Sequence, residues 1–178
     1  MSHSAVTPAE LRRAIRTVPD FPKPGIQFKD ITPVLADARL FHGCIELLAA
    51  NYQPGSVDAV VGIDARGFIF AAAVALKLRA GFVPVRKKGK LPYFTHEQSY
   101  DLEYGSNTVA IHTDAVRAGS RVLLVDDLLA TGGTAAAATQ LLQKIGANIL
   151  EIHFLIELSF LNGRDKLKDI PINSLVIY

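Results

Sequence analysis

The most informative segment of the chain is Arg121-Val-Leu-Leu-Val-Asp-Asp-Leu-Leu-Ala-Thr-Gly-Gly-Thr134. Residues 122–125 form an apolar run rich in β-branched side chains, which predicts a strand buried on both faces. Two adjacent carboxylates, Asp126 and Asp127, end this run. After the Thr-Gly-Gly-Thr turn, apolar residues recur at helical spacing over 135–145. The stretch therefore predicts a strand, an acidic turn, a Gly-Thr loop and a helix.

The Gly-Thr loop has the chemistry of a phosphate site. Gly132 and Gly133 allow successive backbone N–H groups to converge, and the positive end of the following helix faces the same point. Thr131 and Thr134 add hydroxyl donors. Because the chain has no G-x-x-x-x-G-K-[ST] motif, a P-loop triphosphatase is disfavoured and one phosphate fits better than three. Buried carboxylates need partners, so the two acids before the loop are assigned to ribose hydroxyls or to a magnesium-bound sugar.

This run, VLLVDDLLATGGT, resembles the ribose-phosphate signature of the type I phosphoribosyltransferases, which use 5-phosphoribosyl 1-pyrophosphate. The alternative for the same pattern is the turn of an ordinary doubly wound protein, with its acids facing water. The resemblance implies that one segment binds the ribose and its phosphate. Its residues are Asp126, Asp127, Leu128, Leu129, Ala130, Thr131, Gly132, Gly133 and Thr134.

Strands and helices alternate along the rest of the chain. Apolar runs predict strands at 57–63, 82–85, 107–112, 149–156 and 174–178, and helices at 7–18, 35–52 and 68–79. With no repeat or low-complexity tract, we expect a single domain over residues 1–178 whose twisted, mostly parallel sheet is flanked by helices, an α/β fold of the type I phosphoribosyltransferase kind. Ligands of such sheets bind outside the carboxyl ends of the strands.

Two segments fit neither period. Residues 18–34 carry four prolines and a glycine, so we expect a stiff surface hood that is neither a helix nor a central strand. Some of its apolar side chains must cover a core edge or a ligand, and the residues alone favour the core edge. Residues 88–105 are expected to form a lid, because compact domains seldom keep so long a loop without a use for it.

A second anion site is expected after the strand at 57–63. That strand runs into Asp64-Ala65-Arg66-Gly67. The five donors of the Arg66 guanidinium suit a phosphate, although a surface ion pair is the alternative from the residues alone. The strand at 82–85 delivers Arg86 and two lysines to the same edge.

Three further segments resemble the adenine phosphoribosyltransferases. They are Phe21-Pro-Lys-Pro-Gly-Ile-Gln-Phe-Lys-Asp-Ile-Thr-Pro33, Arg86-Lys-Lys-Gly-Lys-Leu-Pro92 and Ser99-Tyr-Asp-Leu-Glu-Tyr-Gly105, and the resemblance spans roughly Val18 to Lys168. It implies that adenine and phosphoribosyl pyrophosphate form AMP and pyrophosphate in purine salvage. It also implies a homodimer, and Mg²⁺ held mainly through the substrate with no dedicated protein cage.

The resemblance assigns roles to individual residues. Adenine would lie against Phe28, with the backbone at Gln27 and Lys29 reading the base edge and Leu158 as the opposite wall. Gln27 stands where the family more often has an apolar residue, which bears on base selectivity. Pyrophosphate would be bound by Asp64, Ala65 and Arg66, with a cis Asp64–Ala65 peptide, by Arg86 reaching across the dimer interface, and by Lys87 and Lys90.

Glu103 matches the residue that handles the proton of the purine's five-membered ring. A carboxylate that accepts this proton makes the other ring nitrogen a better nucleophile, so the resemblance makes Glu103 and Arg66 the catalytic pair. From the residues alone, Glu103 is a solvated loop acid. Tyr100 and Tyr104 belong to the lid, where they stack, form hydrogen bonds or simply pack.

Composition excludes several other classes of protein. The net charge is +2, and no basic run is longer than Arg86-Lys87-Lys88, which argues against nucleic-acid and membrane-surface binding. No leader or membrane-length apolar segment is present, so a cytoplasmic protein is expected. A single cysteine, Cys44, excludes an intrachain disulfide. The alternatives that remain are a transferase for another base, such as hypoxanthine or xanthine, and a regulator that senses the ligand without turnover.

Overall fold

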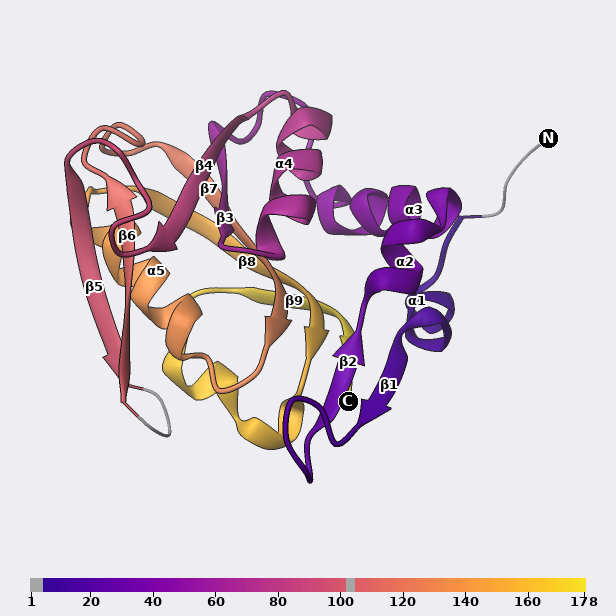
Figure 1. Ribbon diagram of the computed structural model, residues 1–178. Helices are drawn as coiled ribbons and strands as arrows, with labels where there is room; N and C mark the ends of the chain where they lie inside the picture. The colour runs from indigo at the N-terminus through magenta and orange to yellow at the C-terminus, as the bar shows by residue number, and fades with distance from the viewer. Residues whose placement is uncertain (1–4, 102–104) are drawn as a thin grey trace. The chain divides into compact units, whose positions relative to one another are not determined.

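A computed structural model of the chain describes residues 5–101 and 105–178 (Figure 1). The chain divides into two compact units, Met1–Leu47 and Leu48–Tyr178. The expected single domain with a hood at about 18–34 stays a prediction.

The first unit combines short helices with a two-stranded antiparallel sheet. Its elements are α1 (Pro8–Ala14), β1 (Arg16–Pro19), β2 (Gln27–Asp30), α2 (Thr32–Ala36) and most of α3 (Ala38–Ala49). A capping box starts α1: the Thr7 hydroxyl accepts a hydrogen bond from the Glu10 backbone N–H at 3.3 Å, and the Glu10 carboxylate accepts one from Thr7 N–H at 2.9 Å. The sequence predicts this helix start correctly.

The ends of the predicted helices in this unit were wrong. The first helix ends at Ala14, and Val18 lies in β1, opposite Phe28 of β2. The helix expected over 35–52 is divided at Asp37, whose carboxylate accepts a hydrogen bond from the Leu40 backbone N–H at 2.9 Å. A side chain that satisfies a free helical N–H in this way starts a new helix, which apolar periodicity does not reveal.

The apolar residues of the hood have different environments. Ile31 is 1% exposed and belongs to the core, whereas Phe21 and Ile26 remain 51% and 40% exposed. The rings of Phe21 and Phe28 meet edge to face, with centroids 5.1 Å apart. The expectation that some of these side chains cover a core edge is therefore confirmed for Ile31, and Phe21 and Ile26 are not part of the core.

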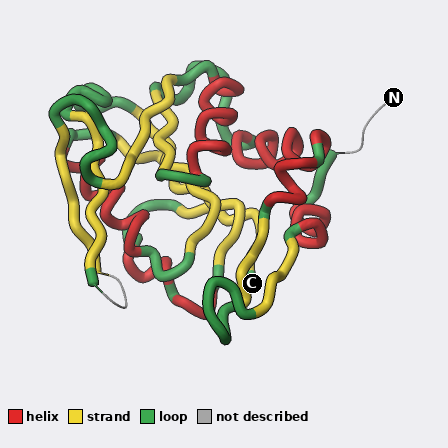
Figure 2. The backbone as a smooth tube through the Cα atoms, viewed as in Figure 1, coloured by secondary structure: helices red, strands yellow, loops and turns green. Residues whose placement is uncertain are grey.

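The second unit is an α/β domain around a seven-stranded sheet (Figure 2). The strands lie in the order β5-β6-β4-β3-β7-β8-β9, with β4, β3, β7, β8 and β9 mutually parallel and the β5–β6 hairpin antiparallel at one edge. The elements are β3 (Ala59–Ile63), α4 (Gly67–Leu78), β4 (Gly81–Lys87), β5 (Thr95–Asp101), β6 (Ser106–His112), β7 (Arg121–Leu129), α5 (Gly133–Lys144), β8 (Asn148–Glu157), two 3₁₀ helices η1 (Ser159–Leu161) and η2 (Gly163–Lys166), and β9 (Ile172–Ile177). The predicted mostly parallel α/β sheet is confirmed.

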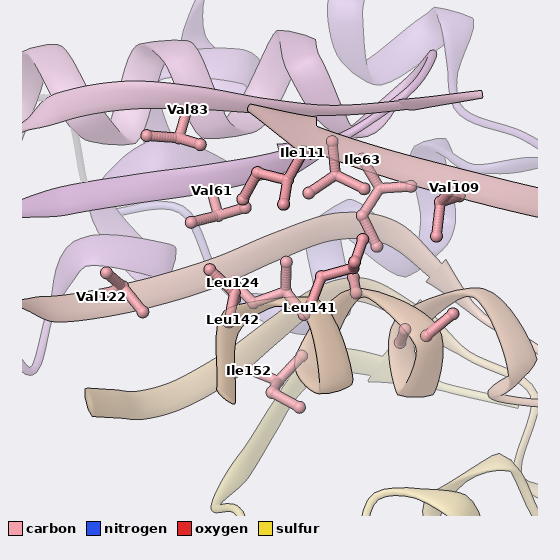
Figure 3. Close-up of a cluster of buried hydrophobic side chains, with 14 of the residues drawn as sticks. Val61, Ile63, Val83, Val109, Ile111, Val122, Leu124, Leu141, Leu142 and Ile152 are labelled. Atoms are coloured by element: carbon pink, nitrogen blue, oxygen red, sulfur yellow. The ribbon is translucent and has the colours of Figure 1, made fainter. Parts of the chain in front are cut away.

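The two longer helices of this unit cover opposite faces of the sheet. Val61 and Leu124 point into a buried cluster that contains Leu141 and Leu142 of α5 (Figure 3). Gly62, the next residue after Val61, faces α4: a Cβ added there would lie 2.7 Å from the Ala71 Cβ. Since successive strand residues point to opposite faces, α4 and α5 lie on the two sides of β3.

Two expectations about strands were wrong. The lid was expected to be irregular over 88–105, yet β5 occupies Thr95–Asp101 and pairs along its length with β6. Most of its side chains are polar on both faces, so the sequence shows no alternation of apolar and polar residues that would predict a strand. The strand forms because its backbone pairs with β6. The central strand also continues beyond Val125 to Leu129, because β8 pairs with it as far as Glu157. Asp126 and Asp127 therefore lie within the strand and do not end it.

None of the described helices is long and apolar enough to cross a membrane. The cytoplasmic location expected from the sequence stays a prediction.

Gly62→Ala should destabilise the fold by about 1–3 kcal/mol, because the added methyl group would overlap the Ala71 side chain and lie 2.9 Å from the Phe82 ring. Urea unfolding followed by circular dichroism measures this change. Gly81→Ala is the matched control, since its Cβ would come no closer than 3.6 Å to Asp58 O. Equal stabilities of the two variants would contradict the packing of α4 on β3 described above.

Candidate active site

The carboxyl ends of β3 and β7 bring two predicted anion-binding loops together. The two strands are parallel neighbours, so the residues that follow them share one edge of the sheet. Arg66, just after β3, places Nη2 2.8 Å from Oδ2 of Asp127 in β7. The expectation that Arg66 and the acidic pair share a rim is confirmed, and in this structure Arg66 forms an ion pair.

Gly67 makes this proximity possible. A Cβ at this position would lie 2.6 Å from Asp126 Oδ1 and 3.1 Å from the carbonyl oxygen of Val125. Any side chain would therefore push the start of α4 away from the end of β7. The group that approaches Gly67 most closely is the Asp126 carboxylate.

The two acids are electrostatically strained, because both are largely buried. Burial raises the pKa of Asp127, and the Arg66 guanidinium opposes that change. Burial, followed by the neighbouring charge of Asp127, raises the pKa of Asp126 well above its usual range. The Asp126 carboxylate accepts a hydrogen bond from Asp127 N–H at 2.9 Å. Hydroxyl donors or a cation placed beside this pair would favour its ionised form.

The Gly-Thr loop surrounds a polar cavity of about 80 Å³. The cavity is lined by Asp126 and by residues 128–135, nearly the whole predicted ribose-phosphate segment. Gly132 has a left-handed φ of 78°, and α5 begins at Gly133, so the loop turns directly into a helix amino terminus. The space is several times what one water requires, and side chains do not fill it. It therefore accommodates an oxyanion.

Tyr100 of β5 contacts this loop. The Thr134 hydroxyl donates a hydrogen bond to the Tyr100 hydroxyl at 3.0 Å. The Tyr100 ring lies so close that a Cβ on Gly133 would be 3.1 Å from Cδ2. The lid role of Tyr100 stays a prediction, and the other two lid residues assigned by resemblance, Glu103 and Tyr104, lie outside the described residues.

The pyrophosphate residues lie near the ends of β3 and β4. The Asp64–Ala65 peptide is cis, as the resemblance implies. Arg86 donates from Nε to Asp64 Oδ2 at 3.2 Å and from Nη1 to the Lys90 carbonyl at 3.0 Å. Arg86 therefore contacts the loop of its own chain, and its expected reach across a dimer interface stays a prediction. Lys87 and Lys90 are exposed.

The adenine residues are divided between the two compact units. Gln27, Phe28 and Lys29 lie in the first unit and Leu158 in the second. The Lys29 ammonium donates to the Thr17 hydroxyl at 2.9 Å across the β1–β2 ribbon. The assignment of these four residues to the base stays a prediction.

Three residues that contact or support the Gly-Thr loop were missed. Gly163 packs against the backbone of the loop, and the next residue, Arg164, forms an ion pair with the buried Glu157. The Asn162–Gly163 dipeptide signals a turn, but nothing local shows what that turn touches. The contact joins residues about thirty positions apart and exists only in the fold.

Comparison with known proteins agrees with this geometry. The family model described as the phosphoribosyl transferase domain matches residues 32–172. The chain belongs to the phosphoribosyltransferase family. This phosphoribosyltransferase is 58% identical over 162 residues to the adenine phosphoribosyltransferase of Acidothermus cellulolyticus, covering 91% of this chain and 92% of that protein.

Two further relatives extend the likeness. The adenine phosphoribosyltransferase of Christiangramia forsetii is 52% identical over 169 residues, covering 95% of this chain and 99% of its own. The solved structure of the Saccharomyces cerevisiae adenine phosphoribosyltransferase, complexed with D-2,5-dideoxy-2,5-imino-altritol 1,6-bisphosphate and adenine, superposes with a TM-score of 0.90 at 43% identity. That match covers 95% of this chain and 98% of the yeast chain.

Asp126→Asn should raise the Tm of the ligand-free protein at neutral pH. A carboxyl group whose pKa is raised by folding binds more protons when folded, so its contribution to stability falls as the pH rises through the folded pKa. The increase in Tm should therefore be largest above the folded-state pKa of Asp126. It should vanish below about pH 4, the ordinary pKa of Asp. Thermal unfolding across this pH range measures it.

Asp58→Asn is the control of opposite sign. Hydrogen bonds from Arg121 hold the pKa of Asp58 at about 2, so its charged form stabilises the folded state above about pH 4 and that contribution is lost as the pH falls toward 2. This variant should lower the Tm at neutral pH. A lower Tm for Asp126→Asn as well would contradict the strain assigned to the acidic pair.

Proposed function

We propose that this phosphoribosyltransferase transfers the 5-phosphoribosyl group of phosphoribosyl pyrophosphate to adenine, giving AMP and pyrophosphate, in purine salvage. The observation that carries the proposal is the position of the Arg66–Asp127 ion pair on the same sheet edge as the phosphate cavity. The choice of adenine is supported by the high identity to adenine phosphoribosyltransferases over nearly the whole chain.

The cavity suits the 5-phosphate, and the acidic pair suits the ribose. Backbone N–H groups of the loop and the hydroxyls of Thr131 and Thr134 would bind the phosphate oxygens. Asp127 Oδ2 is buried and contacts Arg66 as an ion pair, yet within the described parts of the chain it accepts no hydrogen bond of good geometry. Ribose hydroxyls placed beside Asp126 and Asp127 would supply the missing donors.

Cationic side chains at the ends of β3 and β4 suit the leaving pyrophosphate. Arg66 is 37% exposed, so its guanidinium can bind a ligand oxygen while it remains near Asp127. Arg86, Lys87 and Lys90 add positive charge near the same loop. Charge that develops on pyrophosphate as the glycosidic bond to it breaks would be stabilised there.

Magnesium, which the family implies, fits the donor set. Within 5–101 and 105–178, no three His, Cys, Asp or Glu side chains converge on one metal position. Mg²⁺ commonly binds through one or two carboxylates and substrate phosphates, and Asp126 and Asp127 provide such carboxylates. When bound, the ion would neutralise part of the charge on the pyrophosphate group. The side chains then have to orient the ribose and exclude water from it.

Adenine is assigned to Gln27, Phe28, Lys29 and Leu158. The proton released from the five-membered ring is assigned to Glu103, outside the described residues, since a carboxylate there would leave the attacking nitrogen with a free lone pair. Tyr100 and Tyr104 are assigned to the lid that closes over the reacting groups.

Release of pyrophosphate from phosphoribosyl pyrophosphate in the presence of single bases tests the function. We expect turnover with adenine and a preference of about 10⁴-fold over hypoxanthine, whose edge reverses the donor and acceptor pattern. Arg66→Ala is the control that ties turnover to this site, with a loss of about 100-fold or more. Turnover with another base alone would replace adenine in the proposal, and no turnover with any base would indicate a sensor.

We also propose that the protein is a homodimer that uses the outer surface of α4 and β4. Ile69 and Leu76 lie two turns apart on one side of α4, and they are 41% and 82% exposed. Phe82 of β4 is 39% exposed, and its ring meets Phe68 of α4 with centroids 5.5 Å apart. An exposed apolar surface of this kind is typical of a protein interface.

Leu76→Glu should convert the dimer to a monomer, because the interface would have to bury an unpaired carboxylate. Sedimentation velocity measures the change. Ile177→Glu is the control: Ile177 is 48% exposed on β9, at the other edge of the sheet, and the substitution should leave the dimer intact. A monomeric wild-type protein, or a dimer that survives Leu76→Glu, would reject this interface.

A further inference from the structure

The segment after β8 contacts the back of the phosphate loop. It runs from Glu157, the last residue of β8, through η1 and η2 to Leu167, which is 2% exposed and packs in the main core. Both ends of the segment are therefore fixed to the body of the second unit. Gly163, near the middle of the segment, is buried.

Gly163 and the loop fit together backbone against backbone. A Cβ on Gly163 would overlap the carbonyl oxygen of Ala130 and would lie 2.9 Å from Leu129 Cδ1 and 3.1 Å from Gly132 N. In the other direction, a Cβ on Gly132 would overlap the carbonyl oxygen of Gly163. Neither glycine therefore has room for a side chain of its own, because backbone of the other segment occupies that space. The backbone that lines the phosphate cavity rests directly on Gly163.

An ion pair fixes Gly163 in place. The next residue, Arg164, donates from Nε to Glu157 Oε1 and from Nη2 to Glu157 Oε2, both at 2.7 Å. Glu157 is only 5% exposed, and its register partner on β7 is Leu129, immediately before the loop. A bidentate pair of this type restricts orientation as well as distance. It therefore ties Gly163 to the strand end from which the loop emerges.

The other side of the loop is contacted by Tyr100, as described for Gly133 and Thr134. The loop itself offers mostly backbone N–H groups and small side chains, so it cannot hold its own shape by packing. Donors for an oxyanion are effective only when they are fixed before the ligand arrives. The neighbours on both sides must then provide that rigidity.

We propose that Gly163, fixed by the Glu157–Arg164 pair, is a positioning residue that sets the backbone of Ala130–Gly132 for the 5-phosphate. The inference rests on the proposed function, because it takes the loop to be the phosphate subsite. It deepens that function by assigning three further residues, none of which touches the substrate. A side chain at Gly163 would displace the loop backbone, and even a small displacement would point its N–H groups away from the phosphate oxygens.

Binding of ribose 5-phosphate to Gly163→Ala, measured by calorimetry, tests the inference. The added methyl group must move Ala130 or Gly132, so we expect affinity to fall about ten- to hundredfold. In steady-state assays, KM for phosphoribosyl pyrophosphate should rise while KM for adenine stays constant. Gly81→Ala, whose Cβ meets only ordinary contacts, should bind ribose 5-phosphate as the wild type does.

Substitutions in the ion pair give a second measurement if Gly163→Ala does not fold. Arg164→Met keeps the length of the side chain but removes the guanidinium, and Glu157→Gln removes the partner charge. Each should weaken ribose 5-phosphate binding about tenfold, and the double variant should lose no more than either single one, because the two residues act as a unit. Additive losses would mean that the pair does not act through a common contact.

The outcomes separate the two hypotheses. If the wild type does not bind ribose 5-phosphate, the proposed function fails and this inference fails with it. If the wild type binds but Gly163→Ala and Arg164→Met bind equally well, only the inference is overturned. A lower Tm with unchanged ribose 5-phosphate affinity would show that Gly163 has a purely structural role.

Discussion

Two neighbouring carboxylates at the largely buried end of β7 impose the main constraint on the second unit. Ionised acids in such a place are unfavourable unless cations or hydrogen-bond donors reach them. The fold supplies one cation, Arg66, from the parallel neighbour β3, at 2.8 Å from Asp127. This solution requires the two strands to be adjacent and in register, and it requires Gly67 to let α4 begin against Asp126. Asp127 Oδ2 still has no hydrogen-bond donor within the described residues, which supports the proposal that ribose hydroxyls bind here.

The opposite ends of the same strands show the contrast. Asp58, just before β3, is bound by Arg121 at the start of β7 through both its side chain and its backbone N–H. That pair satisfies its charges within the protein and lowers the pKa of the aspartate to about 2. At the carboxyl end of β7, the pKa values of Asp126 and Asp127 are raised instead. A satisfied ion pair thus lies at the amino ends of these strands, and the proposed ligand site lies at their carboxyl ends.

Backbone-to-backbone contact is the second recurring feature of the site. An oxyanion loop must present its N–H groups, so it is made of glycine and other small residues and has little side-chain surface with which to pack. Gly132 faces Gly163 on one side, and Gly133 faces the Tyr100 ring on the other. The loop proposed to bind the phosphate is therefore contacted by elements remote from it in sequence: the segment after β8 and the β5 edge strand.

Much of this protein was determined by local sequence patterns. The capping box at Thr7, the buried strands, the helices that follow the two anion loops and the chemistry of the Gly-Thr loop all follow from residues within a few positions of one another. The carboxyl-end rule for parallel sheets was enough to place Arg66 beside the acidic pair. Other features depended on partners distant in the chain, which local periodicity cannot specify. The strand β5 has no apolar alternation and forms because β6 pairs with it. The strand β7 extends to Leu129 because β8 pairs with it that far. Gly163 matters only because the fold places it against Ala130 and Gly132.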